Sequence, residues 1–225
     1  MSVSQEIVSL DGPSGAGKST IAKLLAKNLS FKYLDTGAMY RSVTLYFIEN
    51  NININDKAQV LNALDSINIE FDTNNKVYLN NVEVTDKIRE SHIVAFVSQV
   101  ASLDIVRDNM VRLQRMITNN GYYVVDGRDI GSVVLPNAKY KFYIDASVDE
   151  RAKRRHKELL DKGDNISFEE VRESIRCRDE YDSNRKNSPL MVPDNATIID
   201  TTNMTIDEVV KKITDVISNI RALYN

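Results

Sequence analysis

Residues 6–20 read EIVSLDGPSGAGKST, a short apolar run followed by a glycine-rich loop. The spacing of Gly12, four further residues and then Gly17-Lys18-Ser19 matches the phosphate-binding signature G-x-x-x-x-G-K-[ST]. The apolar run is typical of a strand, and an apolar helical stripe follows the loop at Ile21, Leu24, Leu25 and Leu29. This stretch therefore predicts a strand, a phosphate loop and a helix in succession.

Each residue type in the loop has a physical reason to be there. Glycines let backbone N–H groups turn toward phosphate oxygens, and the helix that follows directs its positive end at the anion. Lys18 is predicted to reach the β and γ phosphates, and Ser19 offers a hydroxyl to Mg²⁺. The competing interpretation, a glycine-rich turn that binds nothing, is disfavoured by the flanking strand and helix.

Composition limits the class of protein. A chain of 225 residues suits one α/β domain with a small insertion. Its 29 basic and 32 acidic residues give a net charge of -3, so it lacks the positive field typical of nucleic-acid-binding proteins. Cys177 is the single cysteine, which excludes an internal disulfide and a cysteine zinc cluster. His92 and His156 are far apart in sequence and do not suggest a metal pair or a serine-type triad.

Signals for secretion or membrane insertion are missing from the sequence. Residues 1–12 lack a basic start followed by a long apolar stretch, and no run of about 18 apolar residues occurs. A single cysteine also suits a reducing compartment. We therefore expect a soluble cytoplasmic protein with no membrane or nucleic-acid partner, and a monomer as the default.

Strand-like segments alternate with helical patterns along the chain. They lie at 6–11, 32–35, 122–126, 140–145 and 197–200. This alternation predicts an α/β fold with a five-stranded parallel sheet and helices on both faces. Three later helices have capping-box starts, formed by Ser147 with Glu150, Ser167 with Glu170, and Thr205 with Glu208.

One stretch breaks the alternation. Apolar residues alternate with polar ones in three short runs between Ile67 and Val84, and the turn DTNN separates the first two. We predict an inserted three-stranded antiparallel meander at 66–85. The chain then divides into a core domain at 1–65, 86–150 and 187–225, the meander, and an arginine-rich helical lid at 151–186.

A second chemical signal follows the strand at 122–126, which reads YYVVD and ends in an acid. In phosphate-loop enzymes such an aspartate holds Mg²⁺ or its water shell, and we predict that role for Asp126 together with Ser19. A simple strand-end turn is the alternative. The chain continues as Gly127-Arg128-Asp129, which places a cation and a carboxylate where open parallel sheets bind ligands.

A further strand-to-helix turn, DTGAMYR, covers residues 35–41. Thr36 is placed to cap the helix that follows. Arg41 lies one turn further along, where its guanidinium is placed to grip a second phosphate with two hydrogen bonds.

Seven of the chain's 14 arginines fall between residues 151 and 185. They are Arg151, Arg154, Arg155, Arg172, Arg176, Arg178 and Arg185. Acidic residues interleave them at salt-bridge spacing, so a solvated helical pair explains most of them individually. As a group they suit phosphoryl transfer, in which arginines contribute about 10³ to 10⁵ in rate. Lys162-Gly163, between two helices, fits the hinge of a lid that closes over substrate.

No strong general base is evident in the sequence. A phosphate acceptor needs none, because its second ionisation lies near a pH of about 6. A hydroxyl acceptor would need a base, and Asp35 and Asp129 are the candidates. The arginines beyond the loop favour a phosphate acceptor, and hence a nucleoside monophosphate.

Islands of sequence across nearly the whole chain resemble bacterial cytidylate kinases. They are SLDGPSGAGKST (9–20), LDTGAMYR (34–41), SQVAS (98–102) before Arg107, VVDGRDIGSVVLPNA (124–138), ERAKRR (150–155) and RDEYDSNR (178–185). The phosphate loop is shared with many enzymes, whereas DGRDIG after DTGAMYR is far more specific. The resemblance implies a phosphate-loop kinase fold and transfer of the γ-phosphoryl group of ATP, with Mg²⁺, to CMP or dCMP.

The resemblance also implies roles for individual residues. ATP would bind to Gly12, Pro13, Ser14, Gly15, Ala16, Gly17, Lys18, Ser19, Thr20 and Arg155, and the catalytic residues would be Lys18, Arg128, Asp129, Arg154 and Arg185. Ser98, Arg107 and Asp129 would address the cytosine edge, Thr36, Arg41, Arg128 and Arg185 the acceptor phosphate, and Asp182 and Arg178 the sugar region. Many monophosphate kinases carry glycine where this chain has Ser19, which makes Ser19 a less secure Mg²⁺ ligand than Lys18 is a phosphate ligand.

Two alternatives stay open at this point. One is a phosphate-loop kinase for another small acceptor such as UMP, whose ring carbonyl would face the carboxylate of Asp129. The other is a nucleotide-dependent switch or binding module, which would need a guanine-reading NKxD element that the chain lacks.

Overall fold

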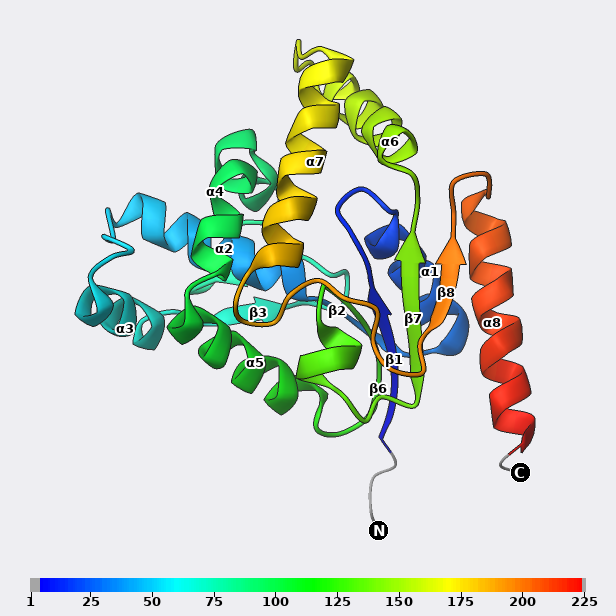
Figure 1. The fold of residues 1–225 in the computed structure, drawn as a ribbon. Coiled ribbons are helices and arrows are strands. Elements are labelled where there is room, and N and C mark those ends of the chain that lie inside the picture. Colours follow the sequence, from blue (N-terminus) through cyan, green and yellow to red (C-terminus); the bar gives the residue numbers. More distant parts are fainter. Residues whose placement is uncertain (1–4, 224–225) are drawn as a thin grey trace. The chain divides into compact units, whose positions relative to one another are not determined.

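The computed structural model describes residues 5–223, and the chain forms two compact units (Figure 1). Unit 1 combines Met1–Leu34 with Asn120–Asn225, and unit 2 is Asp35–Asn119. The predicted lack of a leader at residues 1–12 falls partly outside the described residues. Among those that are described, no helix is both long and apolar enough for a membrane crossing. The predicted division into core, meander and lid stays a prediction.

Unit 1 is built on a five-stranded sheet with the order β2-β6-β1-β7-β8. The strands are β1 (Glu6–Asp11), β2 (Lys32–Asp35), β6 (Tyr122–Asp126), β7 (Tyr140–Asp145) and β8 (Thr197–Asp200), at the predicted positions. Strand β1 pairs in parallel with both β6 and β7, and β7 pairs in parallel with β8. Since β2 lies to one side of β1 and β7 to the other, the carboxyl end of β1 is a switch point of the kind at which such sheets bind ligands.

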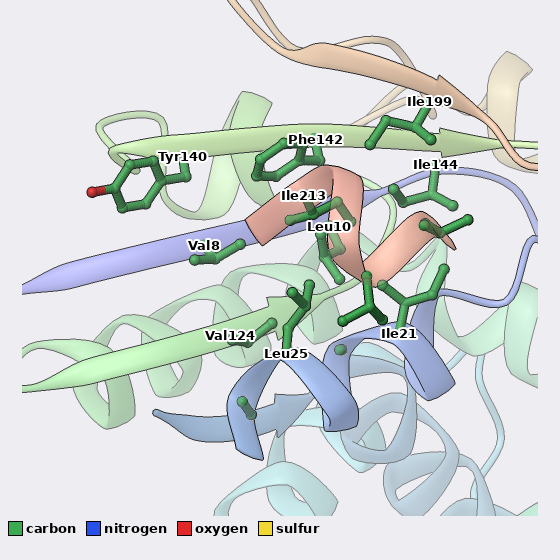
Figure 2. Packing of buried hydrophobic residues seen from close by; sticks show 14 of the residues in the cluster. Val8, Leu10, Ile21, Leu25, Val124, Tyr140, Phe142, Ile144, Ile199 and Ile213 are labelled. Atoms are coloured by element: carbon green, nitrogen blue, oxygen red, sulfur yellow. The ribbon is translucent and has the colours of Figure 1, made fainter. Parts of the chain in front are cut away.

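The main core of unit 1 lies between this sheet and two helices, α1 (Lys18–Leu29) and α8 (Ile206–Leu223). Figure 2 shows Val8 and Leu10 of β1 close to Leu25 of α1 and Ile213 of α8. Burial of one such side chain stabilises the fold by about 1.5–3 kcal/mol. The intervening residues of β1, Ile7, Ser9 and Asp11, are buried as well, so β1 is covered on both faces.

A helical pair in unit 1 consists of α6 (Val148–Asp161) and α7 (Phe168–Asn184), which pack on each other through Ala152, Leu159, Val171 and Ile175. The capping box predicted at the start of α7 is complete. The box before α8 is also formed, since Thr205 and Glu208 each accept a hydrogen bond from the other's backbone amide. The box before α6 is half formed, because the Glu150 carboxylate pairs with Arg154 instead.

Unit 2 contains the predicted antiparallel meander, formed by β3 (Ile69–Phe71), β4 (Val77–Leu79) and β5 (Val82–Glu83). Its helices are α2 (Thr36–Glu49), α3 (Lys57–Asp65), the 3-10 helix η1 (Lys87–Arg89), α4 (Ser91–Ala101) and α5 (Asp104–Thr118). The buried faces of β4, α2, η1 and α4 share one apolar cluster that includes Leu45, Leu79, Ile88 and Ile93. The alternating pattern at 66–85 therefore predicted the sheet correctly.

Candidate active site

The phosphate loop joins β1 to α1, as the signature predicted. Its first residue, Gly12, has a φ of +143°, and a Cβ atom there would lie 2.0 Å from the carbonyl oxygen of Ile144 in β7. Only glycine avoids both the strained backbone and this collision. The loop is thus seated directly against the neighbouring strand at the carboxyl end of β1.

Lys18 begins α1 and is almost fully buried. Its Nζ donates a hydrogen bond to the Pro13 carbonyl oxygen of the loop at 2.7 Å. Burial lowers the pKa of Lys18 well below its usual value, and the nearby charge of Arg128 lowers it further. A phosphate bound against Lys18 and Arg128 would be attracted by both cations and would restore the charge of the lysine.

The two predicted metal residues are in contact. The Ser19 hydroxyl donates to Oδ2 of Asp126 at 2.8 Å, and the Tyr33 hydroxyl donates to Oδ1 at 2.8 Å. Hydroxyl and carboxylate oxygens are the ligand type that Mg²⁺ prefers, so the residues fit the ion. The residues that the structure describes include no group of three or more His, Cys, Asp or Glu able to hold a metal. Besides these two side chains, nucleotide phosphates and water are the usual ligands of such an ion.

Asp182 of α7 is the centre of an arginine cluster in unit 1. Nε of Arg128 donates to its Oδ2 at 3.0 Å, and Nη1 of Arg185 lies 3.8 Å from its Oδ1. Burial raises the pKa of Asp182, but the charges of Arg128, Arg178 and Arg185 outweigh burial and lower it overall. Three guanidinium groups around one carboxylate leave an excess of positive charge, which suits a phosphate.

This cluster lies within electrostatic reach of the phosphate loop. The charges of Arg128 and Arg178 both act on Lys18. Asp129, next to Arg128, is buried, and its charge acts on Asp11 at the end of β1. The structure therefore brings the predicted residues 128, 129, 178, 182 and 185 to the same region of unit 1 as the loop.

The arginines of α6 differ from one another. Arg154 is held by Glu150 at 3.0 Å and by the Thr201 carbonyl at 2.7 Å, and a Cβ on Gly17 would lie 3.9 Å from its Nη1. This position beside the phosphate loop is compatible with its predicted catalytic role. Arg155 pairs with Glu158 on its own helix at 2.9 Å. The predicted roles of both toward nucleotide remain predictions.

Arg151 has a different environment from the solvated lid arginines among which the sequence placed it. Arg151 is buried, and its side chain donates to the carbonyls of Ala146 at 2.9 Å and Ser14 at 3.0 Å. It also pairs with Asp179 of α7 at 2.6 Å. The interpretation as a solvated residue is wrong for Arg151, because these three partners draw it into the protein and tie the phosphate loop to both helices.

The remaining predicted residues lie in unit 2. The prediction that Thr36 caps α2 is wrong: Asp35 is the cap, and its Oδ1 accepts from the Ala38 amide at 2.7 Å. Thr36 is already helical, whereas Asp35 has the extended backbone that an N-cap requires. The carboxylate of Asp35 also pairs with Arg41 at 3.2 Å and lies 3.9 Å from Arg89. Arg89 was missed, because an isolated arginine after the meander gives no signal in the sequence.

Ser98 and Arg107, predicted for the base, lie on α4 and α5. Arg107 is 2% exposed, donates to the Ala101 carbonyl at 3.1 Å, and lies 5.4 Å from the centroid of the Tyr40 ring. Ser98 is half-buried. Their roles in recognising a base stay predictions.

Solved structures resemble this chain in fold. A shikimate kinase from Bacteroides thetaiotaomicron aligns over 96% of this chain and 99% of its own, with a TM-score of 0.51 and 12% identity. An uncharacterized protein from Eubacterium ventriosum gives a TM-score of 0.52 at 12% identity, with the same coverage. These likenesses confirm the predicted phosphate-loop kinase fold.

Sequence relatives are much closer. The cytidylate kinase of Fusobacterium nucleatum is 52% identical over 215 residues, which cover 96% of this chain and 98% of the relative. That of Carboxydothermus hydrogenoformans is 46% identical over 213 residues, which cover 93% and 96%. The family model described as cytidylate kinase matches residues 8–219. The predicted resemblance is thereby confirmed, and the chain belongs to the cytidylate kinase family.

Proposed function

We propose that this protein transfers the γ-phosphoryl group of ATP to CMP or dCMP, giving ADP and CDP or dCDP. The observation that carries the proposal is that unit 1 holds both the phosphate loop with its buried Lys18 and the Arg128–Asp182 cluster, whose Arg128 charge acts on Lys18. In this proposal, Lys18 binds the donor phosphates of ATP, and Arg128 binds the phosphate of the acceptor nucleotide. Membership of the cytidylate kinase family supports cytidine as the acceptor nucleoside.

The arrangement suits transfer between two phosphates. An oxygen of the acceptor phosphate forms the new bond to the γ phosphorus, the bond from that phosphorus to the β–γ bridging oxygen breaks, and ADP departs with the electron pair. The acceptor needs no protein base, since its phosphate is already ionised near neutral pH. Lys18 would exchange the Pro13 carbonyl for the phosphoryl oxygens and stabilise the charge that they carry in the transition state.

Mg²⁺ belongs to the same proposal. When bound, it would neutralise negative charge on the transferring phosphates. Asp126 and Ser19 would hold the ion or its water shell, with Tyr33 fixing the orientation of the Asp126 carboxylate.

Several assignments remain predictions within this proposal. Asp129 would read the cytosine amino group, Asp182 and Arg178 would line the sugar region, and Arg185 would share the acceptor phosphate with Arg128. Roles for Thr36, Arg41, Ser98 and Arg107 toward CMP rest on the motif match. A monomer without nucleic-acid or membrane partners is likewise a prediction.

A panel assay with Mg²⁺ and ATP tests the function. We expect rapid turnover of CMP and dCMP, and slow turnover of UMP, AMP and GMP, with product nucleotides identified by chromatography. Turnover of AMP at a rate equal to that of CMP would contradict the proposal. Strong UMP activity would favour the alternative acceptor, and nucleotide that stays bound without any product would favour a binding module.

A further inference from the structure

Asp11 has a fully buried carboxylate for which the proposed reaction has no use. It is the last residue of β1 and directly precedes Gly12 of the phosphate loop. Its Oδ1 accepts a hydrogen bond from the Ile130 amide at 2.6 Å, and its Oδ2 accepts one from the Gly131 amide at 2.7 Å. Both bonds are shorter than the usual N–H···O distance of about 2.9–3.0 Å.

The two amides belong to a segment that the sequence did not predict, the π-helix η2 (Ile130–Val134). This turn closes on Asp129, whose carbonyl accepts from the amides of Val133 at 2.9 Å and Val134 at 3.0 Å. Single π turns are rare and frequently lie at functional sites. Asp11 therefore holds the first two residues of the turn that follows directly after Arg128 and Asp129.

The contact at Gly131 leaves no spare room. A Cβ atom at Gly131 would lie 3.1 Å from Oδ2 of Asp11 and 3.0 Å from the Ser9 hydroxyl. It would also lie 3.1 Å from Cγ of Pro193 in the loop before β8. The absence of a side chain thus allows the amide to reach the carboxylate, and an added Cβ would force its neighbours to shift by a few tenths of an ångström.

Asp11 is influenced by one charged residue assigned to the acceptor nucleotide and by one assigned to the donor. Asp129 acts on Asp11 from the acceptor side and Lys18 acts on it from the donor side. Asp11 is bonded covalently to the loop and by hydrogen bonds to the turn. It can therefore fix the position of the turn relative to the phosphate loop.

We propose that Asp11 is a positioning residue that fixes Arg128 and Asp129 relative to the phosphate loop, and so aligns the acceptor with the donor phosphate. The inference rests on the proposed function, because it takes these two residues as contacts of CMP. This role predicts different effects on the two substrates. Loosening the turn should weaken CMP binding and slow transfer, while ATP still finds an intact loop.

The test is steady-state kinetics of Asp11→Asn in the full chain. Asparagine keeps the shape of the aspartate side chain and one acceptor oxygen. Its NH2 group replaces the other oxygen and cannot accept a hydrogen bond from the second backbone N–H group. A buried backbone N–H that loses its acceptor corresponds to a factor of about 10 to 100. We expect KM for CMP to rise at least tenfold and kcat to fall, with KM for ATP changed less than about threefold. Amide exchange should accelerate at Ile130 and Gly131.

Ser9→Ala is the matched control, since Ser9 is buried on the same strand and close to Gly131 but donates only a weak 3.5 Å bond, to the Tyr140 carbonyl. It should leave both KM values near those of the wild type. Gly131→Ala provides a second route to the same effect, and it decides the question if Asp11→Asn does not fold.

The outcomes separate the two proposals. A wild-type enzyme that fails to phosphorylate CMP overturns the proposed function. A wild-type enzyme that does so, combined with an Asp11→Asn variant that loses thermal stability but keeps the KM for CMP, overturns the positioning role alone. Equal increases in KM for CMP and ATP would also overturn it, because they would mean that Asp11 merely supports the phosphate loop.

Discussion

Lys18 combines burial with repulsion from like charges. Burial lowers its pKa well below the usual value, and the charges of Arg128 and Arg178 lower it further, against Asp126 and Asp11, which raise it. Such an arrangement is unfavourable for the folded protein alone and favourable once a phosphate is bound. The residue is therefore better explained by ligand binding than by stability, and the two contributions can be separated by mutation.

Lys18→Met keeps most of the side-chain volume and removes the charge. We expect kcat to fall by at least about 10²-fold, the scale of removing one transition-state stabilising group. We expect the melting temperature without nucleotide to stay the same or to rise, because a buried repulsion is removed. The measurements are kcat and calorimetric melting. Lys27→Met, on the exposed face of the same helix, should change neither, and a Lys18→Met enzyme with normal kcat would contradict the role.

Asp11 gives a pH-dependent contribution to stability. Burial raises its pKa to about 7, against the bonds from Gly131 and Ile130 that lower it. In the unfolded chain the pKa is about 3.9. Between these values the folded state holds a proton that the unfolded state has released, so the contribution of Asp11 to stability falls as pH rises from about 4 to 7.

The prediction concerns the difference between wild type and Asp11→Asn. The free energy of unfolding, measured in urea between pH 5 and 8, should decline with pH more steeply for the wild type, because asparagine does not titrate. The two curves should run parallel above about pH 8. A difference that is flat or grows with pH would show that the carboxylate stays ionised throughout this range.

Residue identities in the site could be predicted better than their partners. Lys18, Ser19 and Asp126 follow from local motifs, and the structure places Ser19 against Asp126. The cap at Asp35, the hydroxyl of Tyr33 on Asp126 and the partners of Arg151 could not be predicted. Tyr33 and Arg151 have partners 93 and 137 residues away, and the choice between Asp35 and Thr36 depends on where the helix begins.

At the scale of elements, the five strands of the main sheet were predicted at their observed positions. Apolar runs bounded by polar residues specify strands locally, as in Ile7–Leu10 of β1 and Tyr123–Val125 of β6. The π-helix η2 could not be predicted, because the group that holds its first amides lies 119 and 120 residues earlier in the chain. The periodicity of apolar residues predicts local helices and strands, but it cannot predict a turn that is stabilised by a carboxylate far away in the sequence.

Helices α6 and α7 are joined by two ion pairs that differ in burial. Arg151 and Asp179 are 5% and 20% exposed, whereas Arg172 and Asp149 are 49% and 60% exposed. Removing one partner of a buried pair costs about 3–5 kcal/mol, while an exposed pair contributes about 0–1 kcal/mol. We expect Arg151→Met to lower the free energy of unfolding by about 3 kcal/mol, and Arg172→Met by less than 1 kcal/mol.

Urea unfolding of the two variants measures this contrast. Arg172→Met is the matched control, since it removes an arginine that bridges the same helices at the surface. Arg151→Met should also raise KM for ATP, because it frees the Ser14 carbonyl within the phosphate loop. Equal destabilisation by both variants would mean that burial does not decide how much each ion pair contributes to stability.

At the scale of the whole molecule, any ligand that binds only the folded chain raises its melting temperature. A nucleotide at about 100 times its Kd adds about 2.7 kcal/mol, and 1 kcal/mol shifts melting by about 2–4 °C for a chain of this size. We therefore expect CMP alone and ATP with Mg²⁺ alone each to raise melting by about 5–11 °C. UMP at the CMP concentration should give a clearly smaller shift, because its ring carbonyl would face Asp129.

Asp129→Ala should abolish most of the melting-temperature shift that CMP causes and retain the shift that ATP causes, as calorimetry can show. An Asp129→Ala protein stabilised by CMP as strongly as the wild type would mean that this carboxylate does not read the base.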